Sequence, residues 1–100
     1  KALPVSRFPS VRRDLALIVP ESISAAQIEA SVRRVLGERL QALLIFDVYR
    51  GPGLQPDTKS LAIGLILHDI SRTLTDVDVE QAVSDVLMAL STECDAVLRT

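Results

Sequence analysis

The sequence predicts an α+β fold in which two helices cover one face of a four-stranded antiparallel sheet. Apolar residues follow the strand and helix periods in the order strand, helix, strand, strand, helix, strand. Both helical stretches begin with capping signals, and a turn-rich loop separates the two middle strands. Two such split β-α-β units form a sheet of order 4-1-3-2, which leaves the second sheet face open.

The first strand and helix follow one another closely. Residues 14–19 form a short apolar run, typical of a strand, that stops at Pro20. Ser24 and Gln27 then form a capping box that starts a helix, and Gly37 offers its end. The helix buries one apolar stripe, made of Ala25, Ile28, Val32, Val35 and Leu36.

The second half begins with a predicted hairpin of residues 43–50 and 59–69, because the loop between them is rich in glycine and proline. Thr75 then caps a second helix, whose first turn carries acidic residues that suit the helix dipole. Its apolar stripe consists of Val79, Ala82, Val83, Val86, Leu87 and Leu90. A last short strand over about residues 94–99 completes the sheet.

Length and composition limit the class of protein. One hundred residues suffice for one domain, so we interpret residues 1–100 as a single domain, with residues 1–10 as an arm leading into it. The missing initiator methionine indicates a fragment of a longer chain. No apolar run approaches the ~20 residues of a membrane span. A single cysteine, Cys94, permits no internal disulfide, which fits a cytoplasmic protein.

The charge distribution limits how the chain could bind nucleic acid. A net charge of −2 argues against wrapping of a nucleic-acid backbone, because such affinity scales with the phosphates neutralised. Basic residues nevertheless gather near the start of the chain, and arginine, which predominates among them, pairs well with phosphate. Arg7, Arg12 and Arg50 flank the open face and are the predicted phosphate ligands.

Side chains alternate along strands, which assigns each residue to a sheet face. The residues predicted to face the helices are Leu15, Leu17, Val19, Leu44, Phe46, Val48, Leu61, Ile63, Leu65 and Leu67. Those predicted to face outward include Ala16, Ile45, Asp47, Tyr49, Ser60, Ala62, Gly64, His68 and Arg99. Tyr49 is then the only aromatic side chain expected on the open face.

Symmetric closure of the hairpin would bring Tyr49 opposite Ser60 and Asp47 opposite Ala62. A ring, a carboxylate, a hydroxyl and small neighbours suit one planar, polar ligand. Guanine fits, because its N1–H and N2–H donors can both meet a carboxylate, and single-stranded RNA exposes such edges. The patch alone does not decide for RNA, since outward polar residues are ordinary on any hairpin.

Five stretches of the chain resemble successive signature segments of one known family. They are residues 6–16, 46–51, 59–62, 72–76 and 96–99, in the family's order and spacing. The family is the ferredoxin-like anticodon-binding domain that ends the beta chain of bacterial phenylalanyl-tRNA synthetase. The resemblance implies binding of the anticodon stem-loop of phenylalanine tRNA (tRNA-Phe), whose first anticodon base is guanine. It also implies the rest of the beta chain and the alpha chain as partners.

Residue by residue, the resemblance implies roles for four outward positions. Tyr49 would stack on the guanine, and Asp47 and Ser60 would hydrogen-bond it. Ala16 would make a packing or backbone contact beneath them. The alternation of the strands independently assigns all four to one face.

Other function classes are less well supported by the residues. The chain has one histidine, no asparagine, no glycine-rich phosphate loop and no Cys-x-x-Cys motif, so we expect no catalysis, metal or cofactor in this domain. An amino-acid-binding regulatory module or a protein-docking domain stays open as the alternative. It would use the apolar outward residues Ile18, Ile45, Ile66 and Val97.

Overall fold

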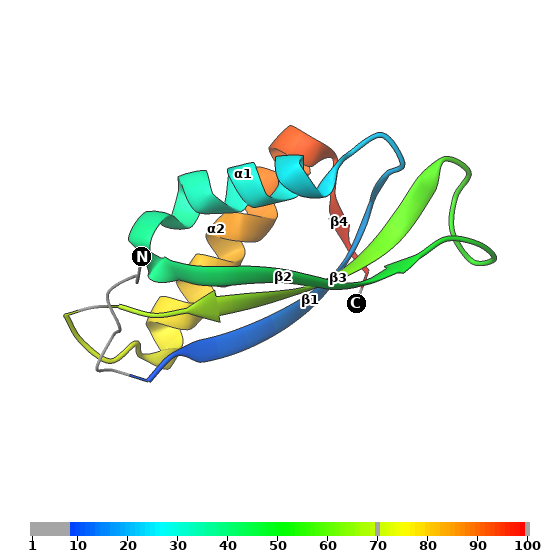
Figure 1. Cartoon of the computed structure of the whole chain (residues 1–100). Coiled ribbons are helices and arrows are strands. Elements are labelled where there is room, and N and C mark those ends of the chain that lie inside the picture. The colour runs from blue at the N-terminus through cyan, green and yellow to red at the C-terminus, as the bar shows by residue number, and fades with distance from the viewer. Residues whose placement is uncertain (1–8, 70, 100) are drawn as a thin grey trace, which may run out of the picture.

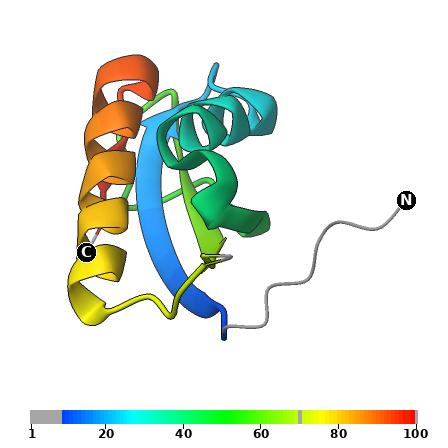
Figure 2. The same ribbon diagram turned by 90° about the vertical axis from the view of Figure 1, so that its left-hand side faces the viewer.

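The computed structural model describes residues 9–69 and 71–99. The elements are β1 (Val11–Pro20), α1 (Ala25–Leu36), a 3₁₀ turn η1 (Gly37–Arg39), β2 (Leu40–Tyr49), β3 (Thr58–Leu67), α2 (Asp76–Cys94) and β4 (Val97–Leu98). The sheet is antiparallel in the order β2-β3-β1-β4, and both helices pack on one of its faces (Figures 1 and 2). The predicted fold class and strand order are therefore confirmed. Arg7 lies outside the described residues.

The core lies between the sheet and the two helices. Its fully buried side chains are Leu17, Val19, Ile28, Val32, Ile63, Leu65, Leu67, Val86 and Leu90. They come from alternate positions of the central strands β1 and β3 and from one stripe of each helix. The helices therefore cover one face, and the residues between these positions in the strands lie on the other.

Both helices begin with capping boxes; the box at Ser24 was predicted, whereas at Thr75 only a helix cap was predicted. The Gln27 backbone N–H donates to Ser24 Oγ, and the Ser24 N–H donates to Gln27 Oε1. At α2 the Asp78 N–H donates to Thr75 Oγ1, and the Thr75 N–H donates to Asp78 Oδ2. Each box satisfies backbone donors that a helix start leaves without partners.

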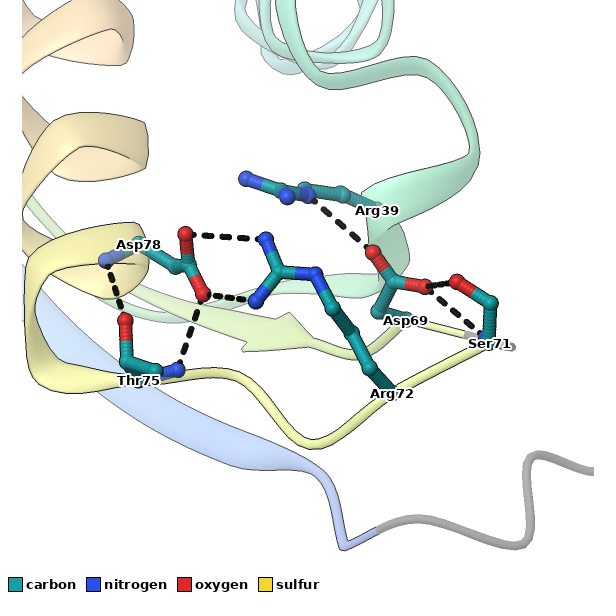
Figure 3. Close-up of polar contacts among 6 residues, drawn as sticks. All are labelled: Arg39, Asp69, Ser71, Arg72, Thr75 and Asp78. Atoms are coloured by element: carbon teal, nitrogen blue, oxygen red, sulfur yellow. Dashed lines mark hydrogen bonds and ion pairs between the residues drawn. The ribbon is translucent and has the colours of Figure 1, made fainter.

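Side-chain contacts hold the connection from β3 to α2 (Figure 3). The Asp69 carboxylate accepts hydrogen bonds from the backbone N–H and the hydroxyl of Ser71. Arg39 lies 3.5 Å from the same carboxylate, Nε to Oδ2. Arg72 donates two hydrogen bonds to Asp78, so the capping residue of α2 is also the acid of an ion pair. The loop is thereby joined to the start of the helix.

The end of the chain differs from the prediction of a strand over residues 94–99. Helix α2 continues through Cys94, and β4 contains only Val97 and Leu98. Cys94 follows Leu90 by four residues, so it extends the buried stripe of the helix, and it is 2% exposed. The helix ends only at Asp95, which adopts a left-handed conformation with φ 52°.

Strand β2 contains two irregularities that alternation did not predict. Its pairing with β3 shifts between Leu40 and Ala42 and again between Ile45 and Asp47. Each shift inserts one extra residue, as in a β-bulge, and an extra residue reverses the faces of the residues on one side of it. The second shift leaves Phe46 as the extra residue.

The bulge overturns the face assignments of three residues. Ile45 lies opposite Ile63 and packs against the core, whereas Leu44 lies opposite Gly64 and is 43% exposed. Phe46 is 52% exposed. Val48 does lie on the predicted side, opposite Leu61, but remains 44% exposed because the end of the hairpin projects past the helices (Figure 1).

His68 is also misassigned by alternation. It was expected on the open face, yet it is only 9% exposed and its Nδ1 atom is buried. Strand β3 ends at Leu67, so the two-residue period no longer applies at the next position. The His68 backbone N–H donates to the Arg39 carbonyl, which places the residue beside η1.

Candidate nucleic-acid interface

The open face carries the predicted base-binding residues in two adjacent rows. Tyr49 of β2 lies opposite Ser60 of β3. In the next row Asp47 lies opposite Ala62, which in turn lies opposite Ala16 of β1. Directly opposed residues in an antiparallel pair project to the same face. The structure therefore brings Asp47, Tyr49, Ser60 and Ala16 onto one patch, in the register that the sequence predicts.

The Tyr49 ring is held by the hairpin loop. Its hydroxyl donates a 2.8 Å hydrogen bond to the Pro52 carbonyl. The loop turns at Gly51, whose φ of 138° is one that residues with a side chain rarely adopt. Tyr49 as a whole is 38% exposed, and an exposed aromatic ring can stack on a ligand.

The Ser60 hydroxyl lies beneath an arginine that the sequence reasoning placed on this face without giving it a role. Arg99 Nη1 donates to Ser60 Oγ at 3.1 Å, and Ser60 is only 5% exposed. The Arg99 guanidinium carbon lies 5.6 Å from the centre of the Tyr49 ring. Its backbone N–H donates to the Ala16 carbonyl at 2.7 Å. Arg99 thus contacts three of the four predicted base-binding residues.

Asp47 differs from Tyr49 and Ser60 in having no side-chain partner among the described residues. The residue is exposed, and no described residue hydrogen-bonds its carboxylate or forms an ion pair with it. The neighbouring positions Ala62 and Ala16 are small, so nothing bulky in that row stands beside the acid. The carboxylate is therefore available to accept two hydrogen bonds from a ligand.

The predicted phosphate ligands Arg12 and Arg50 both have carboxylate partners. Arg12 Nε donates to Asp14 at 2.7 Å. Arg50 donates two hydrogen bonds to Glu21, at 2.8 and 2.9 Å, and these hold the pKa of Glu21 below its usual value. A phosphate would have to compete with these carboxylates for either guanidinium.

A second exposed aromatic lies on the open side, contrary to the expectation that Tyr49 would be alone there. The Arg12 guanidinium lies 5.3 Å from the centre of the Phe46 ring. The same guanidinium covers Gly64, where a Cβ would meet Arg12 Nε at 3.3 Å and Asp14 Oδ1 at 3.2 Å. The absence of a side chain at Gly64 lets the Arg12–Asp14 pair lie flat on the sheet.

Residues 9–69 and 71–99 contain neither of two other features that would suggest a function. No three His, Cys, Asp or Glu side chains gather closely enough there to hold a metal ion. No helix in that part of the chain is both long enough and apolar enough to cross a membrane.

A sheet with helices on one face and an aromatic ring, an acid and a hydroxyl on the other defines a small α+β domain with one uncovered sheet face. The particular family follows from comparison. The model of the ferredoxin-fold anticodon binding domain matches residues 6–99, and the chain belongs to this family. The family is named for anticodon binding and not for a chemical step.

Curated relatives agree with the family. The chain is similar to the phenylalanine–tRNA ligase beta subunit of Xanthomonas euvesicatoria, at 51% identity over 104 residues, and to that of Xylella fastidiosa strain 9a5c, at 46% over 100 residues. Both matches cover 100% of this chain. The chain spans only 13% of the length of these relatives.

Proposed function

We propose that this chain is the anticodon-binding domain of a phenylalanine–tRNA ligase beta subunit, and that its open sheet face binds the anticodon stem-loop of tRNA-Phe. The family assignment and the names of the relatives support the proposal. The observation that carries it is the patch itself. An exposed, anchored Tyr49 and an unpaired Asp47 lie on neighbouring rows of one face.

The proposal assigns each residue of the patch a contact with the first anticodon base, a guanine. The Tyr49 ring stacks on the base, as aromatic side chains do with unpaired bases. The Asp47 carboxylate accepts from N1–H and N2–H. Ser60 hydrogen-bonds the base through its hydroxyl proton, which its contact with Arg99 leaves available because the oxygen is the acceptor there. Ala16 lies in the same row as Asp47 and provides a small packing surface.

The phosphate contacts are assigned to arginines at the border of the patch. Arg12 and Arg50 reach a phosphate by exchanging their carboxylate partners for it. Arg7, which lies outside the described residues, is assigned a phosphate contact from the sequence alone. Exposed ion pairs contribute about 0–1 kcal/mol, so this exchange costs little. The gain is correspondingly small, and the base contacts determine specificity.

The domain acts in this proposal as one part of a larger cytoplasmic enzyme. The rest of the beta chain and the alpha chain supply the aminoacylation chemistry. This domain positions the tRNA by its anticodon end and needs no cofactor of its own.

A titration tests the proposal. The 100-residue chain is added to a fluorescein-labelled tRNA-Phe anticodon stem-loop, and to a hairpin with the same stem and a scrambled loop, while anisotropy is recorded. We expect saturable binding that is stronger for the tRNA-Phe loop. Equal binding to both hairpins would contradict the proposal. Binding of free amino acids, followed by NMR shifts of Tyr49 and Ser60, would favour a regulatory module instead.

A further inference from the structure

Arg99 differs from the other basic residues in its partners. Nine Lys and Arg residues are described, and eight of them lie within 4.0 Å of a carboxylate: Arg12, Arg13, Arg33, Arg34, Arg39, Arg50, Lys59 and Arg72. Within the described residues Arg99 alone has no such partner. It contacts a hydroxyl and an aromatic ring instead. Its charge is therefore not neutralised by any described part of the chain.

The strand pairing places Arg99 in the same row as Asp47. Ile18 lies opposite Val97 and Leu17 opposite Leu98, so Arg99 comes next to Ala16, to which it hydrogen-bonds. The row then reads Asp47, Ala62 and Ala16 across β2, β3 and β1, and it continues to Arg99, which directly follows β4. The Asp47 carboxylate and the Arg99 guanidinium thus lie on either side of two alanines. Neither has an ion-pair partner among the described residues, and no ion pair joins the two.

The position of the guanidinium favours a contact with a base over a contact with a phosphate. It lies against the sheet, because it reaches across β1 to bond Ser60 and leaves that residue 5% exposed. Its distance of 5.6 Å from the centre of the Tyr49 ring leaves the ring partly exposed for stacking. A base on Tyr49 would therefore meet the guanidinium at its edge, whereas the phosphates would follow the border of the patch.

The chemistry of guanine matches this pair of charges. Its N1–H and N2–H are donors, and its O6 and N7 are acceptors that an arginine fork recognises. Adenine carries an amino group in place of O6 and cannot accept both arginine donors. We propose that Arg99 is a specificity-determining residue of this site, which donates to O6 and N7 of the purine while Asp47 accepts from N1–H and N2–H. This inference rests on the proposed function and deepens it.

The test replaces atoms of the base and residues of the protein in parallel. Stem-loops of tRNA-Phe carry guanine, 7-deazaguanine (no N7 acceptor) or inosine (no N2 amino group) at the first anticodon position. Their affinities are measured for wild type, Arg99→Ala, Arg99→Lys and Arg33→Ala. Arg33 lies on α1 and pairs with Glu29, so it controls for the loss of one positive charge away from the open face. Thermal melting verifies folding of each variant.

Arg99→Ala should weaken binding of the guanine loop by about tenfold, within the range for one bidentate contact, and Arg33→Ala by about twofold or less. In wild type, replacing guanine by 7-deazaguanine should weaken binding by about threefold to tenfold, within the range for one typical hydrogen bond. In Arg99→Ala the same replacement should change the affinity by almost nothing. The loss of affinity caused by inosine should persist in Arg99→Ala, because inosine lacks the N2 amino group that Asp47, and not Arg99, is proposed to bind. Arg99→Lys should recover only part of the affinity, since lysine lacks the fork.

Other outcomes would overturn the inference. A 7-deazaguanine penalty unchanged in Arg99→Ala would show that Arg99 does not contact N7. An unchanged penalty together with a smaller salt dependence would assign Arg99 to a phosphate, and tighter binding by Arg99→Ala would show that it blocks the patch. These results leave the proposed function intact. A wild type that binds no loop, or binds all three loops and a scrambled one equally, would overturn both.

Discussion

The hydroxyl of Tyr49 donates a hydrogen bond to the carbonyl oxygen of Pro52, three residues further along the chain and on the turn of the β2–β3 hairpin. This bond connects the ring to a loop whose glycines, Gly51 and Gly53, both adopt positive φ angles. The ring is thereby oriented by the backbone before any ligand arrives. Pre-orientation reduces the entropy that binding must pay.

The first prediction separates the ring of Tyr49 from its hydroxyl. Tyr49→Ala should weaken stem-loop binding by about 1–3 kcal/mol, the usual contribution of one base–aromatic stack. Tyr49→Phe keeps the ring and removes only the bond to Pro52, so it should retain most of the affinity. Fluorescence anisotropy with the labelled stem-loop gives both values. An equal loss in the two variants would mean that the hydroxyl, and not stacking, provides the contact.

The second prediction concerns Arg50 and its partner Glu21. If Arg50 binds a phosphate, Arg50→Ala should weaken stem-loop binding and lower the salt slope by about one unit. Glu21→Gln should have the opposite effect, because it frees the guanidinium and removes a nearby negative charge. Arg12→Ala is expected to behave as Arg50→Ala does. Affinities at several salt concentrations give the slopes, and slopes unchanged in all three variants would exclude both arginines from the interface.

The third prediction concerns acid stability at the start of α2. The hydrogen bonds from Arg72, and next the one from the Thr75 backbone, hold the pKa of Asp78 well below its usual value (Figure 3). A lowered folded-state pKa stabilises the fold above the unfolded value of about 4, and this contribution is lost as pH falls below it. Asp78→Asn should therefore lower the melting temperature at pH 7 and flatten its fall in acid.

Thermal melts at pH 7, 4 and 2.5 check this expectation. Asp76→Asn is the matched control, since Asp76 also lies in the first turn of α2 but takes no part in the drawn network. It should retain most of the acid dependence of wild type. The same fall in Asp78→Asn as in wild type would show that this carboxylate is not responsible.

Local signals explain why the fold was predictable. The capping box at Ser24 and the helix cap at Thr75 are each encoded within four residues and occur as predicted. The order of strands and helices then admits few topologies. The end of α2 was misplaced because the apolar position Cys94 satisfies both a strand and the buried stripe of a helix.

The patch was predictable only up to the bulge. Tyr49 and Asp47 lie between the hairpin loop and Phe46, so counting outward from the loop gives their partners correctly. Beyond Phe46 the same counting fails for Leu44 and Ile45. The position of a bulge is determined by how the two strands pair, and the sequence of β2 alone does not indicate it. For Arg99, alternation gives the face but not how far a long side chain reaches across it.

The most direct test of the account replaces Asp47 by asparagine and changes the base. Asparagine keeps one carbonyl acceptor but presents an amide donor to one of the two guanine donors. Asp47→Asn should stay folded by circular dichroism, because the residue is exposed and has no partner among the described residues. Its affinity for the guanine loop should fall by about 1–3 kcal/mol, whereas that for the same loop with adenine should fall less or rise. Equal weakening of both loops would contradict recognition of guanine by this carboxylate.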